Sequence, residues 1–150
     1  MRAFLDTSVL VAAFYKDHEH HEASFRLLLA QPVSGSGKQT GCTAAHCLAE
    51  VYAVLTGMPG KDRATGDEAL LFLGDVRHRL KVLELAEGDY VAILERAAAA
   101  GVAGGGIYDA LLAGCAMKAK AETIYTWNTK HFARIGGDVA ARVKSPAWQQ

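Results

Sequence analysis

Residues 2–14 read RAFLDTSVLVAAF, and the fold prediction starts from this stretch. Residues 2–5 are typical of a short buried strand, and from about Ser8 onward the apolar positions suit a helix. Asp6 stands at the junction between the two predicted elements. Because parallel sheets bind their ligands beyond the carboxyl ends of the strands, Asp6 is the first candidate for a functional residue.

The rest of the chain continues to alternate between strands and helices. Further strands are predicted over residues 81–85 and 122–127, with a last edge strand over 138–143. Helices are predicted over residues 22–31, 43–57, 64–80, 89–100 and 107–121, with a short helical turn over 128–135. An exposed loop is expected over residues 33–41. This alternation favours a three-layer α/β/α sandwich with a mainly parallel sheet, formed by one domain over residues 1–150.

Composition narrows the class of protein. The chain has 150 residues, about one domain's worth, and no apolar run approaches the roughly 18 to 20 residues that cross a bilayer, so no membrane association is expected. Sixteen Lys and Arg balance sixteen Asp and Glu, which argues against the basic surface of a static nucleic-acid binder. An enzyme that meets a phosphodiester through metal ions remains compatible with this balance. The three cysteines form no C-x-x-C pair, and no signal peptide is recognised, so a cytoplasmic protein is expected.

Two aspartates occupy positions where a functional and a structural role are both open. Asp6 suits a sheet-edge site, yet aspartate is also a favoured N-terminal cap of a helix. Asp109 lies in the first turn of its predicted helix, where the helix dipole favours an acid. The residues one and two turns further on are Leu112, Ala113 and Ala116, so Asp109 would head an apolar, core-facing strip. A carboxylate in such a place needs a partner.

Glu50 and Asn128 are the other two candidates. Glu50 lies near His46 on an otherwise apolar helix, where it would face either solvent or a polar cleft. Asn128 follows the strand over 122–127 and would either cap the next helix or offer its amide oxygen to a metal ion or a water molecule. Several acids converging on one sheet edge repel one another unless a divalent cation lies between them, and oxygen ligands suit Mg²⁺ or Mn²⁺.

Four segments resemble the motifs of a known family. They are FLDTSVLVAAF at 4–14, LAEVYAVL at 48–55, IYDALLAGCA at 107–116 and IYTWNTKHFARI at 124–135. In order and spacing they are similar to the four motifs of PIN-domain nucleases, especially the VapC toxins of VapBC toxin–antitoxin pairs. The resemblance implies an α/β/α sandwich, a Mg²⁺-dependent endoribonuclease that acts on RNA, a small antitoxin that inserts near the active site, and a homodimer.

The resemblance also implies roles for individual residues. Asp6 and Asp109 match the two metal-binding aspartates, and Glu50 matches the helical acid of the family. Many members carry aspartate at the fourth position, where this chain has Asn128, which cannot ionise and so offers less charge to a second metal ion. Small hydroxyl positions are matched by Thr126 and by Thr7 or Ser8. The resulting hypothesis is that Asp6 and Asp109 hold one Mg²⁺, partly through water, while Glu50 positions or deprotonates the attacking water and Asn128 orients water or phosphate.

Two other functions stay open at this stage. A non-catalytic PIN-like module would bind RNA or protein through the same fold. A phosphatase with Asp6 as nucleophile is less favoured, because haloacid-dehalogenase-type enzymes need a second aspartate where this chain has Ser8.

Three surface features accompany these candidates. The segment DHEHHE at 17–22 is interpreted as a solvated loop, with a transition-metal site as the alternative. The final third of the chain has a surplus of basic residues, which suits either an RNA backbone or an ordinary solvated face; they are Lys118, Lys120, Lys130, Arg134, Arg142 and Lys144. Leu27, Leu28, Leu29 and Phe25 overfill one helix face, so part of that face is expected to meet a partner.

Overall fold

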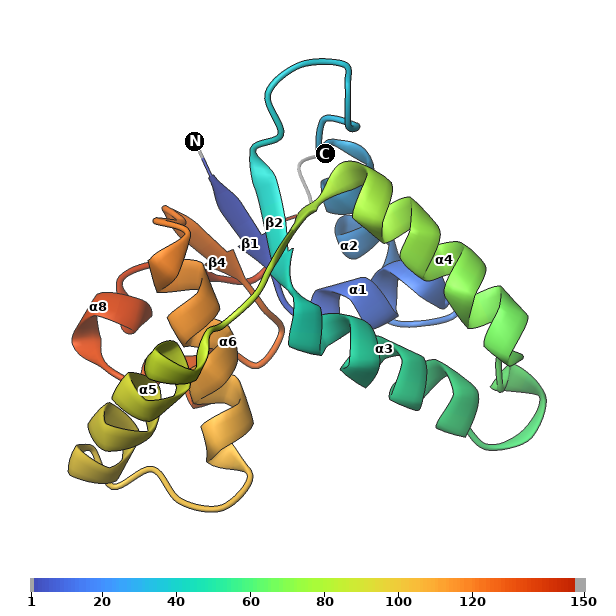
Figure 1. The fold of residues 1–150 in the computed structure, drawn as a ribbon. Coiled ribbons are helices and arrows are strands. Elements are labelled where there is room, and N and C mark those ends of the chain that lie inside the picture. Colours follow the sequence, from blue (N-terminus) through green and yellow to red (C-terminus); the bar gives the residue numbers. More distant parts are fainter. Residues whose placement is uncertain (1, 148–150) are drawn as a thin grey trace.

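A five-stranded parallel sheet in the order β3-β2-β1-β4-β5 lies at the centre of the molecule (Figure 1). The structure is a computed structural model that describes residues 2–147. The strands are β1 (Ala3–Leu5), β2 (Gly41–Ala44), β3 (Lys81–Leu83), β4 (Thr123–Tyr125) and β5 (Val143–Lys144). All neighbouring strands are parallel, so their carboxyl ends share one edge of the sheet.

Helices cover both faces of this sheet (Figure 1). One layer holds α1 (Thr7–Phe14), α2 (His21–Leu29), α3 (Ala45–Gly57) and α4 (Gly66–Arg79), with the short 3-10 helix Gly60–Asp62 between the last two. The other layer holds α5 (Glu87–Ala99), α6 (Gly106–Lys118), α7 (Thr129–Ala133) and α8 (Gly137–Ala140). The three-layer α/β/α prediction is therefore confirmed. That one domain spans 1–150 stays a prediction, and its ends, Met1 and residues 148–150, lie outside the described residues.

Strand β2 was not predicted. We expected Gly41 in an exposed loop and a helix from Thr43, whereas residues Gly41–Ala44 form a strand and the helix begins at Ala45. All four residues of β2 are buried, so the strand shows no alternation of polar and apolar positions. The buried Thr43 hydroxyl donates a hydrogen bond of 2.8 Å to the carbonyl oxygen of Leu5. A short strand of this kind has no periodicity that separates it from the start of a helix.

The strand predicted over 138–143 is also wrong in its extent. Residues Gly137–Ala140 form the short helix α8, and only Val143–Lys144 pair with β4. Asp138 lies in the first turn of α8, and its side chain accepts a hydrogen bond from the backbone N–H of Val139. An acid near the start of a helix is stabilised by the free N–H groups there, which outweighed the weak strand pattern.

The central strand β1 anchors the core and points its carboxyl end at the site. Phe4 and Leu5 are fully buried, as are the three cysteines of the chain. The pairing of β1 with β4 places Leu5 opposite Tyr125. As a result, Asp6 and Thr126 emerge side by side just beyond the two strands. Among residues 2–147, no helix combines the length and apolar character that would cross a membrane.

We expect Phe4→Ala to destabilise the fold by about 3–5 kcal/mol, because it leaves a cavity beneath the middle of the sheet. Phe25→Ala is the matched control, since the Phe25 side chain on α2 is 39% exposed, and it should cost less than about 2 kcal/mol. Urea unfolding of both variants measures the difference. Equal losses would contradict the position of Phe4 at the centre of the core.

Candidate active site

A cleft of about 450 Å³ opens at the carboxyl edge of the sheet. We call it the carboxylate cleft, because Asp6, Glu50 and Asp109 all line it, together with Asn128. Asp6 follows β1, Glu50 lies on α3, Asp109 lies on α6, and Asn128 precedes α7. The structure thus brings together all four residues selected from the sequence, although they come from four separate parts of the chain.

Asp6 is buried and its carboxylate accepts three hydrogen bonds. Oδ1 accepts from the backbone N–H of Val9 at 3.2 Å and from the hydroxyl of Ser8 at 2.7 Å, and Oδ2 accepts from the hydroxyl of Thr126 at 2.6 Å. Asp6 is also the N-cap residue of α1. The capping interpretation is therefore correct, and it does not compete with a place in the cleft, because one carboxylate does both.

The two hydroxyls that contact Asp6 are themselves held by the segment after β4. Ser8 Oγ accepts a hydrogen bond of 2.9 Å from the backbone N–H of Trp127, and Thr126 Oγ1 accepts one of 2.9 Å from the N–H of Asn128. Each hydroxyl therefore accepts from a backbone N–H and donates to the carboxylate. This arrangement ties β1, α1 and the turn after β4 to one another around Asp6.

Burial shifts all three carboxylates toward their protonated forms. It raises the pKa of Asp6 from 3.8 to about 6, against the lowering effect of its hydrogen bonds with Ser8, Thr126 and Val9, and the negative charge of Asp109 adds to the rise. Burial also raises the pKa of Glu50 and of Asp109, and Asp109 further raises that of Glu50. The carboxylates are thus close enough to repel one another, and a positive charge between them would relieve that repulsion.

Glu50 is partly buried against a histidine on its own helix. Its Oε1 lies 3.2 Å from Nε2 of His46, which confirms the predicted proximity, and its side chain is 34% exposed. His46 lowers the pKa of Glu50 and so opposes the effect of burial. Oε1 of Glu50 and Oγ1 of Thr7 are buried, yet neither makes a hydrogen bond of good geometry with any residue among 2–147. Buried polar atoms of this kind usually serve a ligand, an ion or water.

Asp109 lies in the first turn of α6, above the apolar strip that the sequence predicted. Leu112, Ala113 and Ala116 are buried beneath it. Its Oδ2 lies 3.9 Å from Nδ1 of His131 on α7, and His131 lowers the pKa that burial raises. Asn128 occupies the N-cap position of α7, but its side chain makes no capping hydrogen bond in the described part of the chain. The amide of Asn128 therefore remains available to the cleft.

These residues fit a divalent cation that keeps much of its water. Among the described residues, no three His, Cys, Asp or Glu side chains are grouped closely enough to hold a metal ion by themselves. Mg²⁺ dehydrates reluctantly and is commonly bound through one or two carboxylates. Two mutually repelling aspartates match that requirement, and the buried oxygens of Glu50 and Thr7, which make no hydrogen bond of good geometry among residues 2–147, line the same cleft.

The rim of the cleft contains residues that the sequence analysis did not assign to the site. His18, Glu19 and His20, from the predicted solvated loop, line the cleft together with Trp127. The His20 ring stacks on Trp127 with 3.7 Å between ring centroids and 7° between planes, and Trp127 Nε1 donates to Ser24 Oγ at 2.9 Å. No pattern in the sequence predicts this stack, because it joins segments more than 100 residues apart and depends on the order of the strands.

The chain is similar to proteins of one known family. The family model described as PIN domain matches residues 3–138. Ribonuclease VapC40 of Mycobacterium tuberculosis, from strains CDC 1551 / Oshkosh and ATCC 25618 / H37Rv, is 34% identical over 119 residues, which make up 79% of this chain and 81% of that protein.

Solved structures share the fold. Mycobacterium tuberculosis VapC20, described as a sarcin-ricin loop cleaving toxin, superposes with a TM-score of 0.66 and 18% identity, covering 86% of this chain and 92% of the other. VapBC2 from Rickettsia felis, bound to a DNA fragment from its promoter, gives a TM-score of 0.65 and 21% identity, covering 99% and 100%. At these identities the two likenesses concern the fold.

The raised pKa of Asp6 makes the metal-free protein sensitive to pH. Because the folded state keeps a proton on Asp6 up to about pH 6 while the unfolded state loses it near pH 3.8, this residue's stabilising contribution is complete below about pH 4 and is lost as pH rises to about 6. Asp6→Asn removes that loss. We expect the variant to exceed the wild type at about pH 7.5 by on the order of 2–3 kcal/mol, with little difference at about pH 4.

Urea unfolding in the presence of a chelator measures this effect. Asp75→Asn, which changes an exposed acid on α4, controls for the loss of one negative charge and should keep the wild-type dependence. If wild type and Asp6→Asn lose stability in parallel between the two pH values, Asp6 is not the group responsible.

Proposed function

Because the chain belongs to the PIN-domain family, we propose that it is a divalent-metal-dependent endoribonuclease and the toxin of a VapBC-type toxin–antitoxin pair. The relative with 34% identity is named a ribonuclease. The observation that carries the proposal is the carboxylate cleft, where buried Asp6 meets Glu50 and Asp109 at one end of a parallel sheet. Three acids with raised pKa values in one cleft are typical of a catalytic site.

Asp6 and Asp109 would hold the cation, which we expect to be Mg²⁺, with Mn²⁺ as a substitute. Such a cation supplies positive charge against the developing charge of the phosphate and makes water more acidic. The hydrogen bonds from Ser8, Thr126 and Val9 fix the orientation of the Asp6 carboxylate before any ligand arrives. Preorganisation of this kind avoids the cost of rearranging the site during reaction.

Glu50 is the proposed proton acceptor. Burial raises its pKa, and a general base acts best when its pKa approaches the working pH. Its Oε1 lies 3.2 Å from Nε2 of His46 but makes no hydrogen bond of good geometry with a described residue, which leaves it able to accept one from the attacking water. The amide of Asn128, which lines the same cleft, would orient water or a phosphate oxygen. As a neutral group it adds no charge for a second cation.

Partners follow from the same assignment. The Rickettsia felis structure holds a toxin–antitoxin pair named VapBC2, and we propose that this chain likewise binds a cognate antitoxin and forms a homodimer. Exposed apolar side chains on two helices support this proposal, because such side chains often form the contact surface for a protein partner. On α2, Phe25 and Leu29 are 39% and 46% exposed while Leu28 is buried, and on α4, Leu70 and Leu71 are 61% and 75% exposed.

Cleavage of a mixed tRNA and rRNA pool by the purified protein tests the proposed activity. We expect cutting with Mg²⁺, none with a chelator, and a loss of at least about a hundredfold for Asp6→Asn and for Asp109→Asn, because each substitution removes a negative charge from the cation site. Asp75→Asn should cut like the wild type. A folded wild type that cuts no RNA with any divalent cation would favour the non-catalytic module, and cutting by Asp6→Asn at the wild-type rate would overturn the site.

His46→Gln tests the role of Glu50 separately. Since His46 lowers the pKa of Glu50, the variant should need a higher pH to deprotonate Glu50, and the acid limb of its kcat profile should move to higher pH. Activity near the alkaline plateau should stay within a few-fold of wild type. Glu50→Gln, by contrast, should lose about 10²–10⁴-fold at every pH. An unshifted acid limb in His46→Gln would exclude Glu50 as the titrating base.

A further inference from the structure

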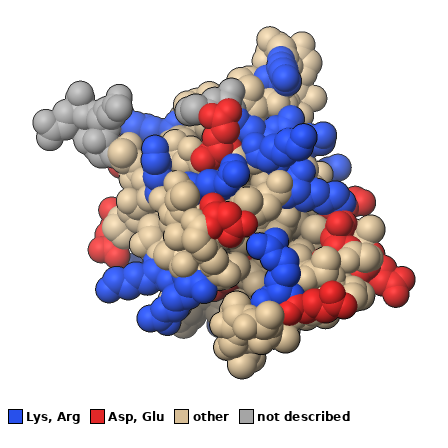
Figure 2. All heavy atoms as spheres, turned by 90° about the vertical axis from the view of Figure 1, so that its left-hand side faces the viewer, with Lys and Arg blue, Asp and Glu red and all other residues tan. Residues whose placement is uncertain are grey.

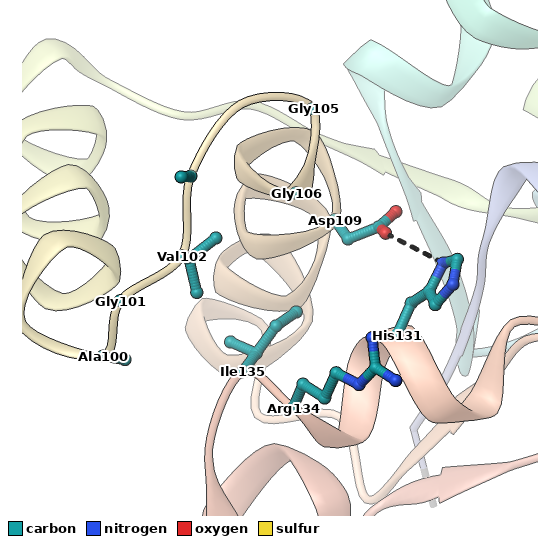
Figure 3. Close-up of a pocket in the computed structure, with 10 residues that line it drawn as sticks. Ala100, Gly101, Val102, Gly105, Gly106, Asp109, His131, Arg134 and Ile135 are labelled. Atoms are coloured by element: carbon teal, nitrogen blue, oxygen red, sulfur yellow. Dashed lines mark ion pairs between the residues drawn. The ribbon is translucent and has the colours of Figure 1, made fainter.

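A second hollow, of about 610 Å³, adjoins the carboxylate cleft. It lies between the loop of residues 100–106 and helix α7 (Figure 3). We call it the Arg134 hollow. Asp109 lines both cavities, so the two meet at this side chain. The volume falls within the range of about 300–1,000 Å³ in which proteins bury whole small ligands.

The polar side chains that line the Arg134 hollow are Asp109, His131 and Arg134. Figure 3 shows His131 on α7 and Arg134 at the C-terminal end of that helix, with His131 directed at the Asp109 carboxylate. Arg134 is exposed, and its guanidinium makes no ion pair or hydrogen bond with any residue among 2–147. Its charge and its five N–H donors are therefore free for a ligand.

Two basic side chains on the neighbouring helices α5 and α6 are engaged in ion pairs. Figure 2 views the side of the molecule that carries α5, α6 and α8, and on it Lys and Arg alternate with Asp and Glu. Lys118 lies 2.7 Å from Asp89, and Arg96 lies 3.4 Å from Asp138. Of the six basic residues noted in the sequence, Lys118 is thus paired, whereas Arg134 and Lys130 make no ion pair with any residue among 2–147.

The opposite wall of the hollow is backbone with few side chains. Gly101 and Gly104 have positive φ angles of 75° and 58°, a backbone conformation that favours glycine, so the turn itself accounts for both residues. Gly105 has no such requirement, and a Cβ there would meet no atom within 4 Å. Nothing within the described protein therefore explains the missing side chain of Gly105. Without a side chain at Gly105, the backbone of a ligand could approach the protein backbone closely at this point.

We propose that the Arg134 hollow is a substrate subsite that binds the RNA nucleotide adjacent to the scissile phosphate, with Arg134 contacting that nucleotide's own phosphate. The chain of RNA would run from the carboxylate cleft past Asp109 and across Gly105. Val102 and Ile135, which also line the hollow, offer apolar contact to the ribose or base. The inference rests on the proposed function in one respect, that the ligand is RNA.

The acids of the cleft explain why a neighbouring cation is needed. A polyanion that approaches Asp6, Glu50 and Asp109 is repelled until a metal ion offsets their charge. A guanidinium beside the cleft attracts the strand without contacting the reacting phosphate, and arginine matches phosphate geometry with two parallel N–H donors. Arg134 is accordingly a binding residue that acts on affinity, not on the chemical step.

Kinetics of Arg134→Gln test this assignment. We expect KM for the cleaved RNA to rise about tenfold with kcat within about twofold of wild type, because one charge-assisted phosphate contact is lost before and during the reaction. Arg134→Lys, which keeps the charge, should recover most of the affinity. Arg77→Gln, at an exposed arginine in the last turn of α4 on the other side of the sheet, is the matched control and should change neither constant.

A binding measurement separates this inference from the proposed catalytic activity. In the Asp6→Asn background, fluorescence anisotropy with a labelled single-stranded RNA of mixed sequence should show about tenfold weaker binding for Arg134→Gln. The slope of log affinity against log salt should fall by about 0.7, the value for one phosphate contact on a single strand.

The outcomes distinguish the two ideas. If the wild type cuts RNA and Arg134→Gln changes neither KM nor the salt slope, the subsite is overturned and the nuclease proposal stands. The subsite is also overturned if, with KM and the salt slope unchanged, Arg134→Gln weakens the binding of a protein partner. If the wild type cuts nothing but Arg134→Gln still weakens RNA binding and lowers the slope, the subsite stands and the catalytic proposal fails. If the wild type neither cuts nor binds RNA, both fail.

Discussion

The enclosure of the Asp6 carboxylate by Val9, Ser8 and Thr126 is the interaction on which the site depends. It joins the end of the central strand to the first turn of α1 and to the turn after β4. Because Ser8 and Thr126 also accept hydrogen bonds from the backbone N–H groups of Trp127 and Asn128, the position of one acid organises the whole floor of the cleft. The hydrogen bond from Val9 also caps α1, so one carboxylate both caps a helix and lines the cleft.

This enclosure has a thermodynamic cost. Burial raises the pKa of Asp6 to about 6, so its ionised form opposes folding near neutral pH unless a cation is present. Glu50 and Asp109 add to the repulsion. Sites that keep charges close together for a ligand commonly sacrifice stability in the free protein. The opposing contribution comes from the surrounding core, in which Phe4 and Leu5 of β1 are fully buried and the helices pack their inner faces against the sheet.

Charge is divided between the two adjoining cavities. The carboxylate cleft is acidic and suits a cation, whereas the Arg134 hollow carries a free guanidinium and suits a phosphate. Asp109 and His131 lie at their boundary, 3.9 Å apart. A chain with zero net charge can therefore present to RNA both a site for a metal ion and a contact for the strand, because the opposite charges are separated over a short distance instead of being mixed.

The sequence by itself determined the alternation of strands and helices, the parallel sheet and the four residues of the cleft, because each of those signals is local. Asp6 directly follows a strand, Asn128 comes three residues after the end of another, and Asp109 lies in the first turn of a helix with a visible apolar strip. Tertiary structure alone decided that β2 is a strand, since Gly41–Ala44 are buried on both sides and show no period. It also decided the stacking of His20 on Trp127 and the meeting of Asp109 with His131. Those contacts join residues far apart in the chain, and only the strand order brings them together.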